Sequence, residues 1–139
     1  MILLDTNVVS EWAAPNPSAV VRRWLNALDE DATYVSVVSI AEIARGVDRL
    51  AAGRRKSALA DWLERGLLPR FDERCLRVDE VIALDWARLM GDAERGGRPI
   101  DAFDALIGAT ARVHGLTLAT RNTRDFLDRG ITLVDPWND

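Results

Sequence analysis

Cysteine and histidine are almost missing from this sequence, which holds only Cys75 and His114. A lone cysteine cannot form a disulfide within the chain, and the two residues together are too few for a zinc site. A lone histidine also leaves no convincing Ser/His pair for nucleophilic hydrolysis. His114 follows a helix that we predict to be buried, at the end where a cation suits the helix dipole, so we expect a capping role.

Long apolar runs and excess basic charge are also missing. No apolar stretch approaches the roughly 20 residues that span a bilayer. The opening Met1–Leu4 meets Asp5 at once without a basic leader, so we expect no signal peptide, no membrane contact and a cytoplasmic location. The net charge of −4 argues against a basic nucleic-acid binder, although bound divalent cations can invert the field at a site.

What the chain does contain is a regular alternation of strand and helix patterns across a predicted single domain, residues 1–139. Hydrophobic periodicity predicts strands at 1–4, 34–38, 76–78, 116–119 and 131–134, and helices near 20–28, 39–50, 59–67, 81–94 and 102–113, with Pro69 stopping the third helix. The alternation indicates an α/β fold with a mainly parallel sheet covered on both faces. Ligands of such folds bind at the carboxyl ends of the strands.

Asp5 and Glu42 both stand close to the predicted end of a strand. Asp5 directly follows the first strand, and Glu42 falls in the first turn of the helix after the second strand. Each has a structural alternative. Asp5 could be a turn residue or helix N-cap, and Glu42 could complete a capping box with Ser39 or pair with Arg45.

Asp104 is harder to explain by local structure. It lies near the start of the predicted helix 102–113, which is apolar on nearly every side. An unpaired buried carboxylate costs several kcal/mol unless a cation, a proton or N–H donors compensate it. A capping box with Asp101 as N-cap is the alternative, and we expect Asp101 itself to be a cap. The apolar surroundings favour a functional role for Asp104.

A further polar cluster, residues 120–125, follows the strand at 116–119. Distant segments therefore deliver acids or amides to one edge of one sheet, where the carboxylates would repel each other unless a cation lay between them. Oxygen ligands without histidine or cysteine select Mg²⁺ or Mn²⁺. Phosphodiester hydrolysis is the chemistry that such a site would serve.

Four ordered segments and the C-terminal residues together make a recognisable set. They are Met1–Asn7, Ser39–Gly46, Asp104–Ala111, Leu118–Asn122 and the closing Asp135-Pro136-Trp137. In order and spacing this set resembles the PIN-domain ribonuclease toxins of VapBC-type toxin–antitoxin pairs, and the closing residues resemble the FitB-like branch.

The resemblance implies a PIN-like three-layer α/β/α sandwich and a metal-dependent endoribonuclease, the toxin of a type II pair. It places Mg²⁺ or Mn²⁺ at Asp5, Glu42 and Asp104, with Thr6 and Asn7 in support. It also implies an RNA substrate, a homodimer, and a small cognate antitoxin whose C-terminal segment occupies the toxin groove. Operator DNA would be bound only through that antitoxin.

Position 122 departs from the resemblance, because many members have a fourth aspartate where this chain has Asn122. We expect Asn122 to keep a place in the catalytic site by ordering a water, and also to cap a short helix. We expect Asp125 to be peripheral.

Two other functions compete with the ribonuclease. An aspartate-dependent phosphatase of the haloacid dehalogenase type needs a second aspartate two residues after the first, and that position is Asn7. A catalytically silent PIN-fold binding module would be expected to lose a core acid, yet all three remain. Five tryptophans are predicted to be core or dimer residues rather than RNA-stacking platforms: Trp12, Trp24, Trp62, Trp86 and Trp137.

Overall fold

Five short parallel strands form the central sheet, in the order β3-β2-β1-β4-β5. The computed structural model describes residues 1–138. The strands are β1 (Ile2–Leu4), β2 (Thr33–Ser36), β3 (Cys75–Leu76), β4 (Thr117–Ala119) and β5 (Leu133–Val134). In register, Leu4 of β1 lies opposite Val35 of β2 and Ala119 of β4. The residues that follow these strands therefore emerge at one level, along one edge.

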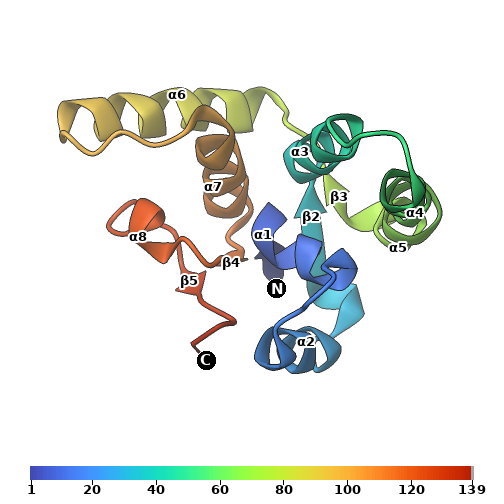
Figure 1. The fold of residues 1–139 in the computed structure, drawn as a ribbon. Coiled ribbons are helices and arrows are strands. Elements are labelled where there is room, and N and C mark those ends of the chain that lie inside the picture. Colours follow the sequence, from blue (N-terminus) through green and yellow to red (C-terminus); the bar gives the residue numbers. More distant parts are fainter. Residues whose placement is uncertain (139) are drawn as a thin grey trace.

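Helices connect the strands and cover both faces of the sheet (Figure 1). The α-helices are α1 (Thr6–Val9), α2 (Ala19–Asn26), α3 (Val37–Asp48), α4 (Arg54–Asp61), α5 (Leu68–Arg70), α6 (Glu80–Arg95), α7 (Ala102–His114) and α8 (Thr123–Phe126). Short 3₁₀ turns occur at η1 (Ser10–Ala13), η2 (Glu30–Ala32) and η4 (Asp72–Arg74), and η3 (Trp62–Leu67) is a π-helical turn. This architecture confirms the predicted three-layer α/β/α sandwich. Within residues 1–138, every helix is too short or too polar to cross a bilayer.

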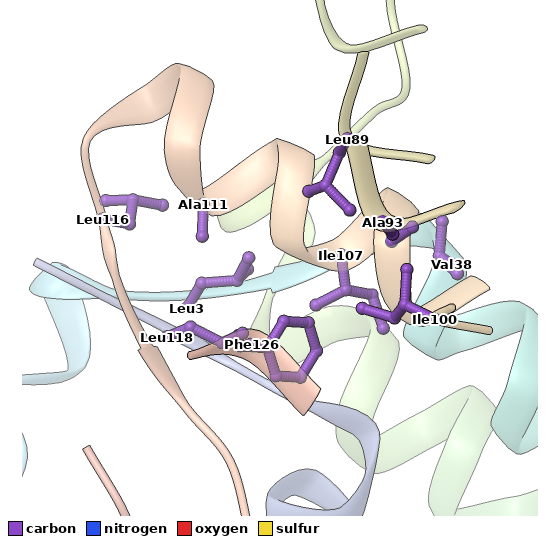
Figure 2. Packing of buried hydrophobic residues seen from close by; sticks show 11 residues of the cluster. Leu3, Val38, Leu89, Ala93, Ile100, Ile107, Ala111, Leu116, Leu118 and Phe126 are labelled. Carbon is purple, nitrogen blue, oxygen red and sulfur yellow. The ribbon is translucent and has the colours of Figure 1, made fainter. Parts of the chain in front are cut away.

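Two separate apolar clusters fill the layers above and below the sheet. Leu3 and Leu118 point to the side of α6 and α7, where Phe126 and Ile107 pack with them (Figure 2). Leu4 belongs to the opposite cluster, together with residues of α1, α2, α3 and η3. Because side chains alternate along a strand, two consecutive leucines of β1 serve two cores. All five tryptophans pack against one cluster or the other, as expected.

Some element boundaries differ from the prediction. The predicted strand 34–38 ends at Ser36, and α3 begins at Val37 rather than at Ser39. The third strand is Cys75–Leu76 rather than 76–78. Pro69 does not stop its helix, because helical backbone continues to Arg70 after the π-helical turn η3. Proline is tolerated in the first turn of a helical segment, where its missing N–H has no partner to lose.

Candidate active site at the carboxyl edge of the sheet

Asp5 is the buried centre of the site and directly follows β1. Its side chain is 2% exposed. Oδ1 accepts the backbone N–H of Thr6 at 2.8 Å, and Oδ2 accepts the Thr120 hydroxyl at 2.7 Å and the Asn7 amide at 3.4 Å. Burial raises the pKa of Asp5, and these hydrogen bonds oppose that rise. The N-cap role expected as an alternative is also present, because Asp5 caps α1.

Glu42 reaches the same edge from the middle of α3. Its Oε1 accepts the Thr6 hydroxyl at 2.7 Å, and the Thr6 oxygen also lies 2.9 Å from the Ser39 hydroxyl. Burial is the main cause of its raised pKa, and the charge of Asp5 adds to it. Both structural alternatives for Glu42 are wrong. Ser36, not Ser39, caps α3, and Arg45 pairs with Asp48 at 3.7 Å.

Asp104 lies in the first turn of α7, half-buried beside the other acids. Asp101 caps this helix, as predicted, by accepting the N–H groups of Phe103 and Asp104. Among residues 1–138, no group donates a hydrogen bond to the Asp104 carboxylate, so a capping box is absent. Burial raises the pKa of Asp104 to about 7, and the charges of Asp5, Asp101, Glu42 and Asp125 contribute in that order.

The α8 segment, residues 122–129, follows β4 and carries Asn122 and Asp125. Asn122 occupies the N-cap position of α8, but its side chain makes no capping hydrogen bond, which corrects half of the expectation. Its backbone N–H donates to the Thr120 hydroxyl at 3.0 Å. The charge of Asp125 raises the pKa of both Asp5 and Asp104, so Asp125 belongs to the electrostatics of the site. We call Asp5, Glu42, Asp101, Asp104 and Asp125 the acidic edge.

The donor chemistry of the acidic edge fits a hard divalent cation. Its potential ligands are carboxylate oxygens, the donors that Mg²⁺ and Mn²⁺ take. A cation would also relieve the repulsion that raises the pKa of Asp104. In the described part of the chain, however, no three acidic, histidine or cysteine side chains converge closely enough to hold an ion as they stand.

Two buried hydroxyls hold this arrangement, and neither was predicted to do so. Thr120 is fully buried and joins Asp5 to the α8 segment. Ser39 is also fully buried and lies under Thr6. Thr120 belongs to the polar cluster that follows the strand at 116–119, and this position at a strand end could have marked it as a site residue. Thr6 and Asn7 contact the acids as the resemblance implied.

Comparison with known proteins identifies the family. The sequence profile of the PIN domain matches residues 2–130. Toxin FitB of Neisseria gonorrhoeae is 41% identical over 100% of both chains, and VapC ribonuclease Y4jK of Sinorhizobium fredii is 36% identical over 99% of this chain and 98% of its own.

Solved structures agree with the sequence relatives. FitAcB from Neisseria gonorrhoeae superposes with a TM-score of 0.94 at 40% identity over 100% of both chains. DNA-bound VapBC from Salmonella typhimurium superposes with a TM-score of 0.78 at 25% identity over 97% of both chains. The chain therefore belongs to the PIN-domain family and is a homologue of the FitB toxin and the VapC ribonucleases.

Proposed function

We propose that this protein is an endoribonuclease that depends on Mg²⁺ or Mn²⁺ and acts as the toxin of a toxin–antitoxin pair. The observation that supports this most concerns Asp104, whose carboxylate accepts no hydrogen bond from a donor among residues 1–138. Burial and the charges of the other four acids of the acidic edge raise its pKa to about 7. Relatives that bear ribonuclease names add to the support.

In this proposal Asp5, Glu42 and Asp104 hold the cation. When bound, it supplies positive charge to the scissile phosphate and lowers the pKa of a water nucleophile. Thr120 and the Thr6 N–H orient the two oxygens of Asp5. The Thr6 hydroxyl keeps Glu42 turned towards Asp5. Asp104 must lose its proton before it can act as a ligand, and the Asn122 side chain remains available to order a water.

The phosphatase alternative has less support. The position where that chemistry needs a second acid is Asn7, whose amide donates to Asp5 and whose Oδ1 accepts the N–H of Arg121 at 3.3 Å. The Asn7 side chain thus serves to position Asp5 and the main chain of Arg121. A silent binding module would have no need for a half-buried carboxylate without a donor.

Cleavage of a structured RNA by the purified protein tests the proposal. We expect cleavage with Mg²⁺ or Mn²⁺, none in EDTA, and none from folded Asp5→Asn or Asp104→Asn protein. Asp92→Asn is the matched control, because Asp92 is exposed on α6 and its ion-pair partner is Arg95. Full activity in EDTA, or a wild-type rate from Asp104→Asn, would contradict the proposal.

An antitoxin is the proposed partner, because structural neighbours of this chain are FitAB and VapBC complexes, some of them bound to DNA. A groove of about 360 Å³ adjoins the acidic edge. Its lining is mostly apolar, with Glu42 at the acidic edge: Thr6, Ser10, Ala13, Ala14, Pro15, Glu42, Ile43, Gly46, Val47, Leu50, Arg55, Leu59 and Trp62. A peptide with apolar side chains and a basic end would complement it, and operator DNA would be reached only through that antitoxin.

Co-expression with the product of a small neighbouring gene tests this partner. We expect the neighbour to relieve growth inhibition by the toxin and to co-purify with it. Gly46→Trp, which fills the groove at a position where an added Cβ meets no atom within 4 Å, should reduce that rescue while leaving cleavage active. Rescue that is unaffected by Gly46→Trp would exclude the groove as the docking site.

A further inference from the structure

The α8 segment, residues 122–129, cannot hold its own position. α8 has only four helical residues, and a helix of that length is not stable by itself. One anchor is apolar, because Phe126 is fully buried and packs so closely on α7 that a Cβ on Gly108 would lie 3.1 Å from its ring. This anchor fixes one point of the segment. Further contacts hold the main chain on either side of Asp125.

Two arginines hold the main chain of this segment. The guanidinium of Arg98 donates to the carbonyl oxygens of Arg124 at 3.1 Å and Leu127 at 3.2 Å. The guanidinium of Arg129 donates to the carbonyl oxygens of Asp125 at 2.7 Å and Arg98 at 2.8 Å. Each arginine thus binds the main chain of the segment that carries the other.

The places of these arginines in the chain connect them to the site. Arg98 lies in the connection between α6 and α7, three residues before Asp101 and six before Asp104. Arg129 closes the segment that carries Asp125. The pair therefore joins the connection that leads into Asp101 and Asp104 to the segment that carries Asp125.

A third arginine ties this pair to the helical layer. Arg112 of α7 donates to the carbonyl oxygen of Arg129 at 2.7 Å. It also binds both carboxylate oxygens of Asp85 on α6, at 2.9 and 3.1 Å. Forked contacts of this kind depend on the planar guanidinium, which lysine cannot reproduce.

We propose that Arg98 and Arg129 are positioning residues that hold the main chain around Asp125 in its place at the acidic edge, and so set how strongly that edge binds its cation. The inference rests on the proposed metal-dependent function. In it, Asp125 contributes charge to the site, and the arginines act only through Asp125.

Calorimetric titration of the metal-free protein with Mn²⁺, without RNA, tests this inference. Loss of a group that orients a metal ligand directly costs roughly 10–100-fold in affinity. The arginines hold the main chain around Asp125 and do not contact a proposed metal ligand. We therefore expect Arg98→Gln to weaken Mn²⁺ binding by a smaller factor, about three- to tenfold. Asp125→Asn should weaken it at least as much, and the Arg98→Gln/Asp125→Asn double variant should be no weaker than Asp125→Asn alone.

Separate variants control for the loss of a positive charge and for a failure to fold. Arg95→Gln removes a nearby cation whose carboxylate partner is Asp92, and it should bind Mn²⁺ like the wild type. Arg98→Lys keeps the charge without the fork and should resemble Arg98→Gln. If Arg98→Gln fails to fold, Arg129→Lys gives the same comparison from the other arginine of the pair.

The titration separates a failure of the proposed function from a failure of this inference. Wild-type protein that binds no Mn²⁺ would overturn the proposed function and this inference with it. Wild-type binding that Arg98→Gln leaves unchanged, or that it weakens equally with and without Asp125, would overturn this inference alone.

Discussion

At the scale of single residues, Asp104 makes stability depend on pH in an unusual direction. Its pKa is about 7 in the folded chain against an ordinary value of 3.8. A carboxyl whose pKa is higher in the folded state binds its proton more tightly there, so folding loses stability as pH rises between those two values. The metal-free protein should therefore be penalised by Asp104 at neutral pH and above.

We therefore expect metal-free Asp104→Asn to be more stable than the wild type at pH 8, with the difference vanishing below about pH 4. Urea denaturation across this pH range in EDTA measures it. Saturating Mn²⁺ should reverse the order, because a ligand that binds only the folded wild type stabilises it selectively. A less stable Asp104→Asn protein at pH 8 in EDTA would mean that the carboxylate has a favourable partner.

Thr120 gives a second prediction at this scale. Thr120→Val removes the hydroxyl that donates to Asp5 and accepts the Asn122 N–H, and we expect a loss of about 1–3 kcal/mol in unfolding free energy. Thr110→Val is the matched control. The buried Thr110 hydroxyl donates to the Leu106 carbonyl oxygen of its own helix, and that carbonyl keeps its helical hydrogen bond in the variant. Equal losses in chemical denaturation of the two variants would contradict a special role for Thr120.

The residues of the site were predictable to different degrees. Asp5 and Asp104 could be nominated because each carboxylate stands next to apolar sequence at a strand end or helix start. The contact from Thr120 to Asp5 spans 115 positions, and it exists because β1 and β4 are neighbours in the sheet. Sequence periodicity predicts strands but not their order, so this partner could not be named.

At the scale of elements, the start of α3 shows how a boundary is decided. Val37 and Val38 are β-branched and extend the strand pattern of β2, yet they form the first turn of the helix. The Ser36 side chain accepts the Val38 N–H at 3.0 Å, and this cap outweighs the β propensity of the two valines. Propensity is a weak prior that tertiary contacts override.

Ser36→Ala should accordingly cost about 1 kcal/mol of stability, the usual price of a lost N-cap. Ser39→Ala should leave the start of α3 unchanged and act on the site through Thr6. Amide hydrogen exchange of Val38 and its neighbours separates the two variants. Faster exchange at the start of α3 in Ser39→Ala, but not in Ser36→Ala, would restore the capping box that the sequence suggested.

At the scale of the whole molecule, exposed apolar side chains on α6 bear on the predicted homodimer. Val81 is 59% exposed and Leu84 is 63% exposed, and residues three apart share one helix face. If this face forms the dimer contact, Leu84→Glu should shift the protein towards monomer in light scattering at micromolar concentration. Leu127→Glu, on the α8 segment, is the control for a charge placed at another exposed leucine. A wild-type protein that is already monomeric would contradict the dimer.

The central position of β1 in the sheet has a consequence for when, during synthesis, the candidate site becomes complete. β1 is made first, but its neighbour β4 comes more than a hundred residues later. Until β4 pairs with it, Asp5 lacks the Thr120 hydroxyl, and the segments that carry Asp104 and Asp125 have not yet been synthesised or docked. A chain cut short before β4 lacks a complete candidate site. The acidic edge is therefore assembled only when nearly the whole chain has been made.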